Sequence, residues 1–118
     1  MALAGIYNAT MDQGAQWTLT VIYDDSNGNP IDLTGYTARM QVRRKYDSST
    51  AVLTLATGGQ GIAITPLTGT LELTATTNQT AAIEGGIYVY DLEITNAGVV
   101  TRLMQGSMTV RPQVTLNA

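Results

Sequence analysis

The chain has 118 residues and a formal net charge of −3, and it contains neither cysteine nor histidine. This length is typical of one domain that buries a core without help from a metal or a disulfide. The two missing residue types exclude disulfide frameworks, cysteine zinc sites and thiol nucleophiles. They also remove the commonest general base, so we expect no enzymatic activity and no cofactor.

The beginning of the sequence carries no sign of an export signal. Met1 leads into Ala2-Leu3-Ala4 without a basic segment or a long apolar run. No stretch approaches the roughly 20 apolar residues that cross a bilayer. We therefore expect a protein that assembles in the cytoplasm of the cell that makes it and does not contact a membrane.

The residue content favours β-structure, because threonine is abundant, glycine occurs 12 times and phenylalanine is absent. The first clear strand signal is in residues 16–25, QWTLTVIYDD, where apolar residues alternate with threonines. Such alternation is typical of a strand with one buried and one exposed face. Residues 26–30, SNGNP, then predict a turn.

Alternation returns in residues 34–44, TGYTARMQVRR, which places Arg39 and Arg43 on the face opposite to the apolar side chains. Three short strands are expected next, separated by turns rich in glycine or proline: 51–56, 62–66 and 69–75. The following stretch, TTNQTAAIEGG, has the one helical signal in the chain. Thr77 or Asn78 is expected to cap a single helical turn there.

The last strongly patterned part of the chain predicts a hairpin. Its strands are expected at 87–95 and 99–110, joined across Asn96-Ala97-Gly98. Gly106 interrupts the second strand, and glycine inside a strand pattern predicts a β-bulge.

Short strands with turn signals at intervals of about 8 to 12 residues are typical of antiparallel sandwiches. We therefore predict an all-β, immunoglobulin-like antiparallel β-sandwich of about eight strands in one domain, residues 1–118. Residues 1–12 and 112–118 are the least patterned. They are candidate edge strands, or arms that contact neighbouring molecules.

A calcium loop is the first candidate site that the residues do not support. Counting from Asp25 places Asn27 and Asn29 at ligand positions of such a loop. Pro30, however, stands where glycine is required, and Tyr36 replaces the glutamate that closes the loop. Turn chemistry explains these residues, so no metal site is expected.

Close acidic pairs were the second candidate, because paired carboxylates perform acid–base catalysis. Asp24-Asp25 lies in a turn, and Asp91 and Glu93 share one face of a strand. Neither pair has a nearby nucleophile or base in the sequence, so both are interpreted as solvated and no catalytic residue is expected.

Four of the six cations lie close together in the sequence: Arg39, Arg43, Arg44 and Lys45. One interpretation is a solvated strand face that resists edge pairing. A second is a charge-complementary contact with another protein, which makes these four residues the candidate interaction site. Nucleic-acid binding is the weakest, because the domain is acidic and lacks aromatic residues between the cations.

Two stretches resemble small structural proteins from the morphogenesis clusters of tailed bacteriophages. They are residues 14–49, from GAQWTLTVIYDD to RRKYDSS, and residues 85–115, from GGIYVYDLEIT to VRPQVT. The described proteins to which they are similar are the N-terminal β-sandwich domains of phage baseplate upper proteins and other virion adaptor domains. Those modules attach fibres or receptor-binding parts, and no functional residue transfers with the likeness.

The resemblance implies a non-enzymatic virion component of a tailed phage: a tail, baseplate or neck adaptor. Its partners would be other virion proteins and copies of itself in a symmetric homo-oligomer, without nucleic acid or membrane. A capsid decoration (cement) protein is the alternative within the structural class. From another class, the alternative is a carbohydrate- or ligand-binding module that uses Trp17 and exposed tyrosines.

Overall fold

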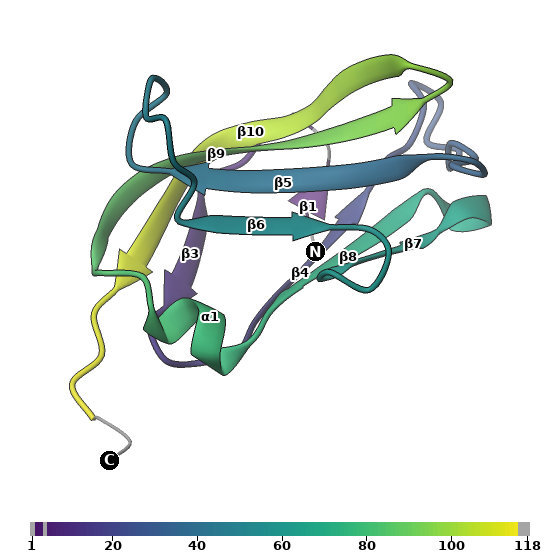
Figure 1. The fold of residues 1–118 in the computed structure, drawn as a ribbon. Coiled ribbons are helices and arrows are strands. Elements are labelled where there is room, and N and C mark those ends of the chain that lie inside the picture. Colours follow the sequence, from purple (N-terminus) through teal and green to yellow (C-terminus); the bar gives the residue numbers. More distant parts are fainter. Residues whose placement is uncertain (1, 4, 116–118) are drawn as a thin grey trace.

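The computed structural model describes residues 2–3 and 5–115, which form two stacked β-sheets (Figure 1). The first sheet has the order β1 (Ala2–Leu3), β4 (Trp17–Ile22), β8 (Thr70–Ala75), β7 (Ile62–Thr65). The second has the order β2 (Gly5–Ile6), β10 (Val99–Arg111), β9 (Gly86–Asn96), β5 (Thr37–Arg43), β6 (Leu53–Ala56), and β3 (Ala9–Asp12) also pairs with β10. Two short helices connect strands: η1 (Pro66–Thr68) and α1 (Thr77–Ala81).

This strand order is that of an immunoglobulin sandwich. If β1 is counted as strand A, the first sheet reads A-B-E-D, and β10, β9 and β5 correspond to G, F and C of the second sheet. The predicted all-β, immunoglobulin-like sandwich is confirmed. The described residues form ten strands, whereas about eight were expected, because the N-terminal segment adds three short strands.

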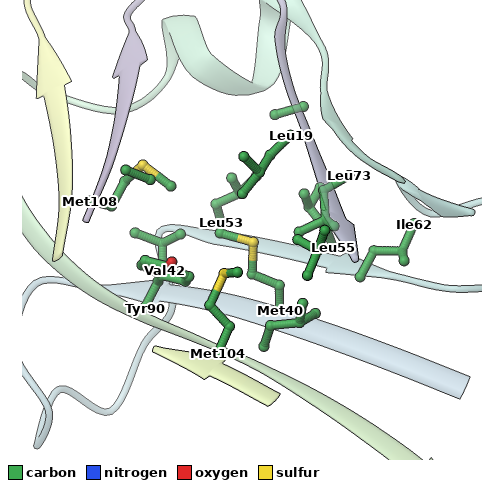
Figure 2. Packing of buried hydrophobic residues seen from close by; sticks show 14 of the residues in the cluster. Leu19, Met40, Val42, Leu53, Leu55, Ile62, Leu73, Tyr90, Met104 and Met108 are labelled. Atoms are coloured by element: carbon green, nitrogen blue, oxygen red, sulfur yellow. The ribbon is translucent and has the colours of Figure 1, made fainter. Parts of the chain in front are cut away.

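Apolar side chains at alternate positions of the strands fill the space between the two sheets. The inward side chains of β4 and β5 are buried as the pattern predicts: Trp17, Leu19, Val21, Ala38, Met40 and Val42. Figure 2 shows Met40, Leu55 and Leu73, from three different strands, facing this common core. Each such side chain contributes about 1.5–3 kcal/mol when it is fully buried.

The N-terminal segment crosses from one sheet to the other and pairs in parallel with strands of its own chain. β1 pairs with β4, whereas β2 and β3 pair with β10. Of the candidate arms, most of the described part of 1–12 thus lies in strands of this sandwich, and residues 7–8 connect β2 to β3. Residues 112–115 form no strand, and residues 116–118 lie outside the described residues. Contact of these ends with neighbouring molecules remains a prediction.

Side chains from the body of the sandwich hold the N-terminal segment in place. The indole Nε1 of Trp17 donates to the carbonyl oxygen of Thr10 at 3.0 Å, and the Tyr90 hydroxyl donates to that of Tyr7 at 2.7 Å. The Tyr90 hydroxyl is a donor at neutral pH even with the ordinary pKa of tyrosine, and burial raises this pKa further. These bonds explain why an unpatterned segment is ordered.

The bulge in β10 is at Leu103, and the prediction that placed it at Gly106 is wrong. The register with β9 shifts between Arg102 and Met104, and Leu103 and Met104 are both buried although they are adjacent. Gly106 itself pairs regularly with Tyr90. Its role is a close approach, since a Cβ atom there would overlap the carbonyl oxygen of Tyr7.

The short helix α1 has a different cap from the one expected. The N-cap is Thr76, not Thr77 or Asn78. The Thr76 side chain accepts from the backbone N–H of Gln79 at 3.2 Å, and the Gln79 side chain accepts from the Thr76 N–H at 2.9 Å. This reciprocal capping box satisfies two backbone donors at once and outweighs the single bonds that the alternatives offer.

We predict that Gly106→Ala destabilises the protein by about 1–3 kcal/mol, because the added methyl group displaces the segment that carries Tyr7. Urea unfolding followed by the fluorescence of Trp17, the single tryptophan, measures this loss. Ser107→Ala is the control on the same strand, with an expected change within about 0.5 kcal/mol. Equal stability of both variants would contradict the docking of this segment on Gly106.

Candidate functional site

The four cations of the candidate interaction site separate in the structure. Arg39 and Arg43 point outward from β5, on the face of the six-stranded sheet that lies away from the core. Arg44 and Lys45 follow in the exposed connection to β6. The sequence cluster therefore supplies two residues to a sheet face and two to a loop.

Arg43 holds the loop that follows β5. Its guanidinium donates to the side-chain oxygen of Gln41 and to the carbonyl oxygen of Ser48, both at 2.8 Å. The Lys45 backbone N–H donates to the Ser48 hydroxyl at 3.1 Å. Arg43 is therefore a structural residue as well as a candidate contact.

Arg44 turns toward the start of β9. Its Nη2 atom lies 3.2 Å from a carboxylate oxygen of Glu84, with both side chains largely exposed. The guanidinium carbon also lies 5.4 Å from the centre of the Tyr88 ring. An exposed pair of this kind contributes about 0–1 kcal/mol, so it orients Arg44 more than it stabilises the fold.

Arg39 belongs to a row of charges that crosses three strands. In the sheet register Arg39 is opposite Glu93, and Glu93 is opposite Arg102. Arg102 also contacts Asp91, with its Nε atom 3.4 Å from that carboxylate, and its Nη2 atom is 3.8 Å from Glu93. Among the described residues, no ion pair or side-chain hydrogen bond involves the Arg39 guanidinium.

A shallow hollow of about 280 Å³ lies on this outer face. Tyr46, which is 80% exposed, contributes an aromatic edge. The rest is lined mostly by polar side chains from β5, β9 and β10: Gln41, Arg43, Asp91, Glu93, Arg102 and Gln105. On this face positive and negative side chains alternate from one strand to the next. It suits a polar surface with matching charges better than a single anion.

The sequence interpretation missed three members of this face, since Asp91 and Glu93 were expected to be solvated and Arg102 was not assigned. A usable signal existed in the hairpin. Once Ala97-Gly98 is identified as a two-residue turn flanked by Asn96 and Val99, counting outwards places residue 93 opposite residue 102. No comparable signal shows that β5 pairs with β9, because Arg39 is far from Glu93 in the sequence and no tight turn joins the two strands.

The rejected calcium loop is a set of turns in the structure. One Asp25 carboxylate oxygen accepts from the backbone N–H groups of Asn27 and Asn29, at 2.9 and 3.0 Å. One Asp32 oxygen accepts from the N–H and the hydroxyl of Thr34, and these bonds lower the pKa of Asp32. Within residues 2–3 and 5–115, no group of three or more metal-ligating side chains occurs.

Trp17 does not offer a sugar-stacking surface, because it is 8% exposed and its indole N–H donates to the carbonyl oxygen of Thr10. Tyr88 and Tyr90 are buried as well. Of the tyrosines, Tyr46 is the one with a largely exposed ring. Nor does any described helix have the length and apolar character needed to cross a membrane.

Comparison with known proteins adds one informative likeness. No family model and no curated protein matches the chain. The solved N-terminal domain of phage TP901-1 ORF48 matches with a TM-score of 0.51 and 11% identity, over 93% of this chain and 98% of that one. A structure of murine CRIg matches with a TM-score of 0.43 and 14% identity, over 91% and 92%. At such identities the first match shows the fold alone, a β-sandwich that a phage protein domain also has.

We predict that excess EDTA leaves the melting temperature unchanged. The carboxylates nearest to a calcium-loop pattern are already occupied by turn N–H groups, so a metal would have to replace existing bonds. Thermal unfolding with EDTA and with added Ca²⁺ measures the effect. A shift of several degrees in either direction would reveal a metal site, with Asp24, Asp25 and Asp32 as its candidates.

Proposed function

We propose that this domain is a non-enzymatic structural component of a tailed phage particle, an adaptor of the tail, baseplate or neck. The likeness to the phage TP901-1 ORF48 domain over 93% of the chain carries this proposal. The resemblance of residues 14–49 and 85–115 to phage structural proteins supports it independently of the fold.

The outer face of the six-stranded sheet is the proposed contact with neighbouring virion proteins. It alternates arginines with carboxylates, and such a surface selects a partner by charge pattern. Arg39 is the residue most available for a partner, because it is exposed and has no side-chain partner among the described residues. The interleaved carboxylates also disfavour nucleic acid, since they would face phosphate groups.

Labelling of purified particles tests the role directly. An antibody against the domain, viewed in negatively stained particles, is expected to mark the tail, its baseplate or the neck. Label spread over the whole head, with hundreds of copies per particle, would replace the adaptor by a capsid decoration protein. Absence of the protein from purified particles would contradict a virion role of either kind.

We predict that Arg39→Glu leaves the purified domain folded but reduces its incorporation into particles. Truncating a charge that is buried against an acidic partner costs about 2–5 kcal/mol, and reversing its sign costs at least as much. Quantifying the protein in particles from complemented infections measures this loss, which should be about 30-fold or more.

Arg39→Lys is the matched control, because it keeps the charge on the same strand position and should be incorporated. Wild-type incorporation should also weaken as salt rises during assembly, since salt screens exposed charges. Normal incorporation of Arg39→Glu would return this face to the interpretation as a solvated surface that keeps the protein soluble.

A further inference from the structure

One part of β10 has an open edge. On the side away from β9, β10 pairs with Gly5–Ile6 at residues 104–105 and with β3 at residues 108–111. Among the described residues, none pairs with Val99–Leu103 on that side. This five-residue stretch lies between the hairpin turn and β2, at the end of the sheet where the β9–β10 hairpin turns (Figure 1).

The backbone of this stretch presents unused hydrogen-bonding groups. In a hairpin with a two-residue turn, the flanking residues form a hydrogen-bonded pair, and the pairs then alternate. Val99 and Thr101 therefore bond to β9, whereas the N–H and C=O groups of Val100 and Arg102 point to the open side. After the bulge the alternation resumes at Gln105, whose carbonyl oxygen does accept from Tyr7 N–H at 3.0 Å.

The edge begins with exposed apolar side chains. Val99 and Val100 are 66% and 57% exposed, and Ile6, at the start of the covered part, is 81% exposed. Natural edges are protected by lysine, proline, inward-pointing charges or β-bulges, and here the bulge at Leu103 protects only the last residue of the stretch. The one charge here belongs to Arg102, and Asp91 and Glu93 already compensate it on the outer face.

We propose that this edge of β10 pairs with the same edge of a second copy, antiparallel about a twofold axis. Val100 then faces Arg102 of the second copy in a hydrogen-bonded pair, and Thr101 faces Thr101 of the second copy. Two such pairs related by the axis form four backbone hydrogen bonds. No like charges face each other in this register, which leaves it self-complementary.

The length of the open stretch favours a second copy over a longer foreign strand. In the proposed register, Val99 of the second copy faces Leu103 and completes the open stretch. The turn residues Gly98 and Ala97 of that copy come level with Met104 and Gln105, which β2 already covers. The turn therefore has to pass on the outer side of Ile6, where its small side chains need little room. A hollow of about 310 Å³, lined by Gly5, Ile6 and residues 102–105, receives it.

A contact of four to five residues per copy is small. Stable interfaces bury about 1,200–2,000 Å² in total, so the isolated dimer is expected to be weak and to gain strength when other contacts hold the copies together. This self-pairing is a separate claim from the virion role. It can be tested with purified protein alone, without any particle.

A single introduced thiol tests the pairing, since the chain has no cysteine of its own. Thr101 is in a non-hydrogen-bonded pair in the proposed register, with about 4.5 Å between Cα atoms, a separation that suits a disulfide. Thr101→Cys should form covalent dimers under mild oxidation at least tenfold faster than Thr54→Cys. The control position is exposed on β6, the opposite edge of the same sheet.

A second substitution distinguishes edge pairing from random collision. Val100→Pro in the Thr101→Cys background removes the N–H that faces the open side but spares the bonds to β9. It should reduce cross-linking to the rate of Thr54→Cys, and Val100→Lys should act in the same direction without restricting the backbone.

Two results would overturn the proposal. One is equal cross-linking of Thr101→Cys and Thr54→Cys, or a rate that neither change at Val100 affects. The other is cross-linking in particles to a different protein alone, which would assign the open edge to a strand of that protein.

Discussion

The two-residue turn at Ala97-Gly98 sets the register on which the rest of the sheet depends. Both residues have positive φ, 51° and 80°, as the tight hairpin turn with the right twist requires. Ala97 is the one non-glycine residue with such a backbone in the described part of the chain, and its conformation is held by the strands on either side. The pairing that results places Leu92 and Ile94 in the core and Asp91 and Glu93 outside. A slip by one residue would bury both carboxylates.

The same register determines what remains for other chain segments. It presents Gly106 where the carbonyl group of Tyr7 must approach, so the N-terminal segment pairs with the second half of β10. The first half keeps an open edge beside the charged outer face. Both surfaces that we assign to contacts thus lie on one sheet, while the four-stranded sheet presents mainly threonines outward. The domain therefore has one surface for each proposed contact, the first recognised by charge pattern and the second by strand pairing.

Local patterns in the sequence predicted the parts of the fold that local physics decides. Alternation identified β4, β5, β9 and β10, and the turn signals separated the shorter strands correctly, because burial on one face imposes a period of two. For residues 1–12 the sequence left arms and edge strands open and did not predict the parallel pairing, since the partners lie about 20 to 100 residues away. For the same reason, the four cations that are close in the sequence do not form one surface in the structure: Arg39, Arg43, Arg44 and Lys45. Strand pairing places Glu93 and Arg102 in the same row as Arg39. Arg44 instead lies next to Glu84.

Amide hydrogen exchange along β10, followed residue by residue by NMR, tests the account at its centre. At low protein concentration the Thr101 amide, which bonds to β9, should exchange slowly, and the neighbouring Val100 amide, which faces the open edge, should exchange quickly. Raising the concentration should slow exchange at Val100 as second copies pair with the edge. Protection of Val100 at low concentration, or fast exchange at Thr101, would contradict the register from which the charged face and the open edge both follow.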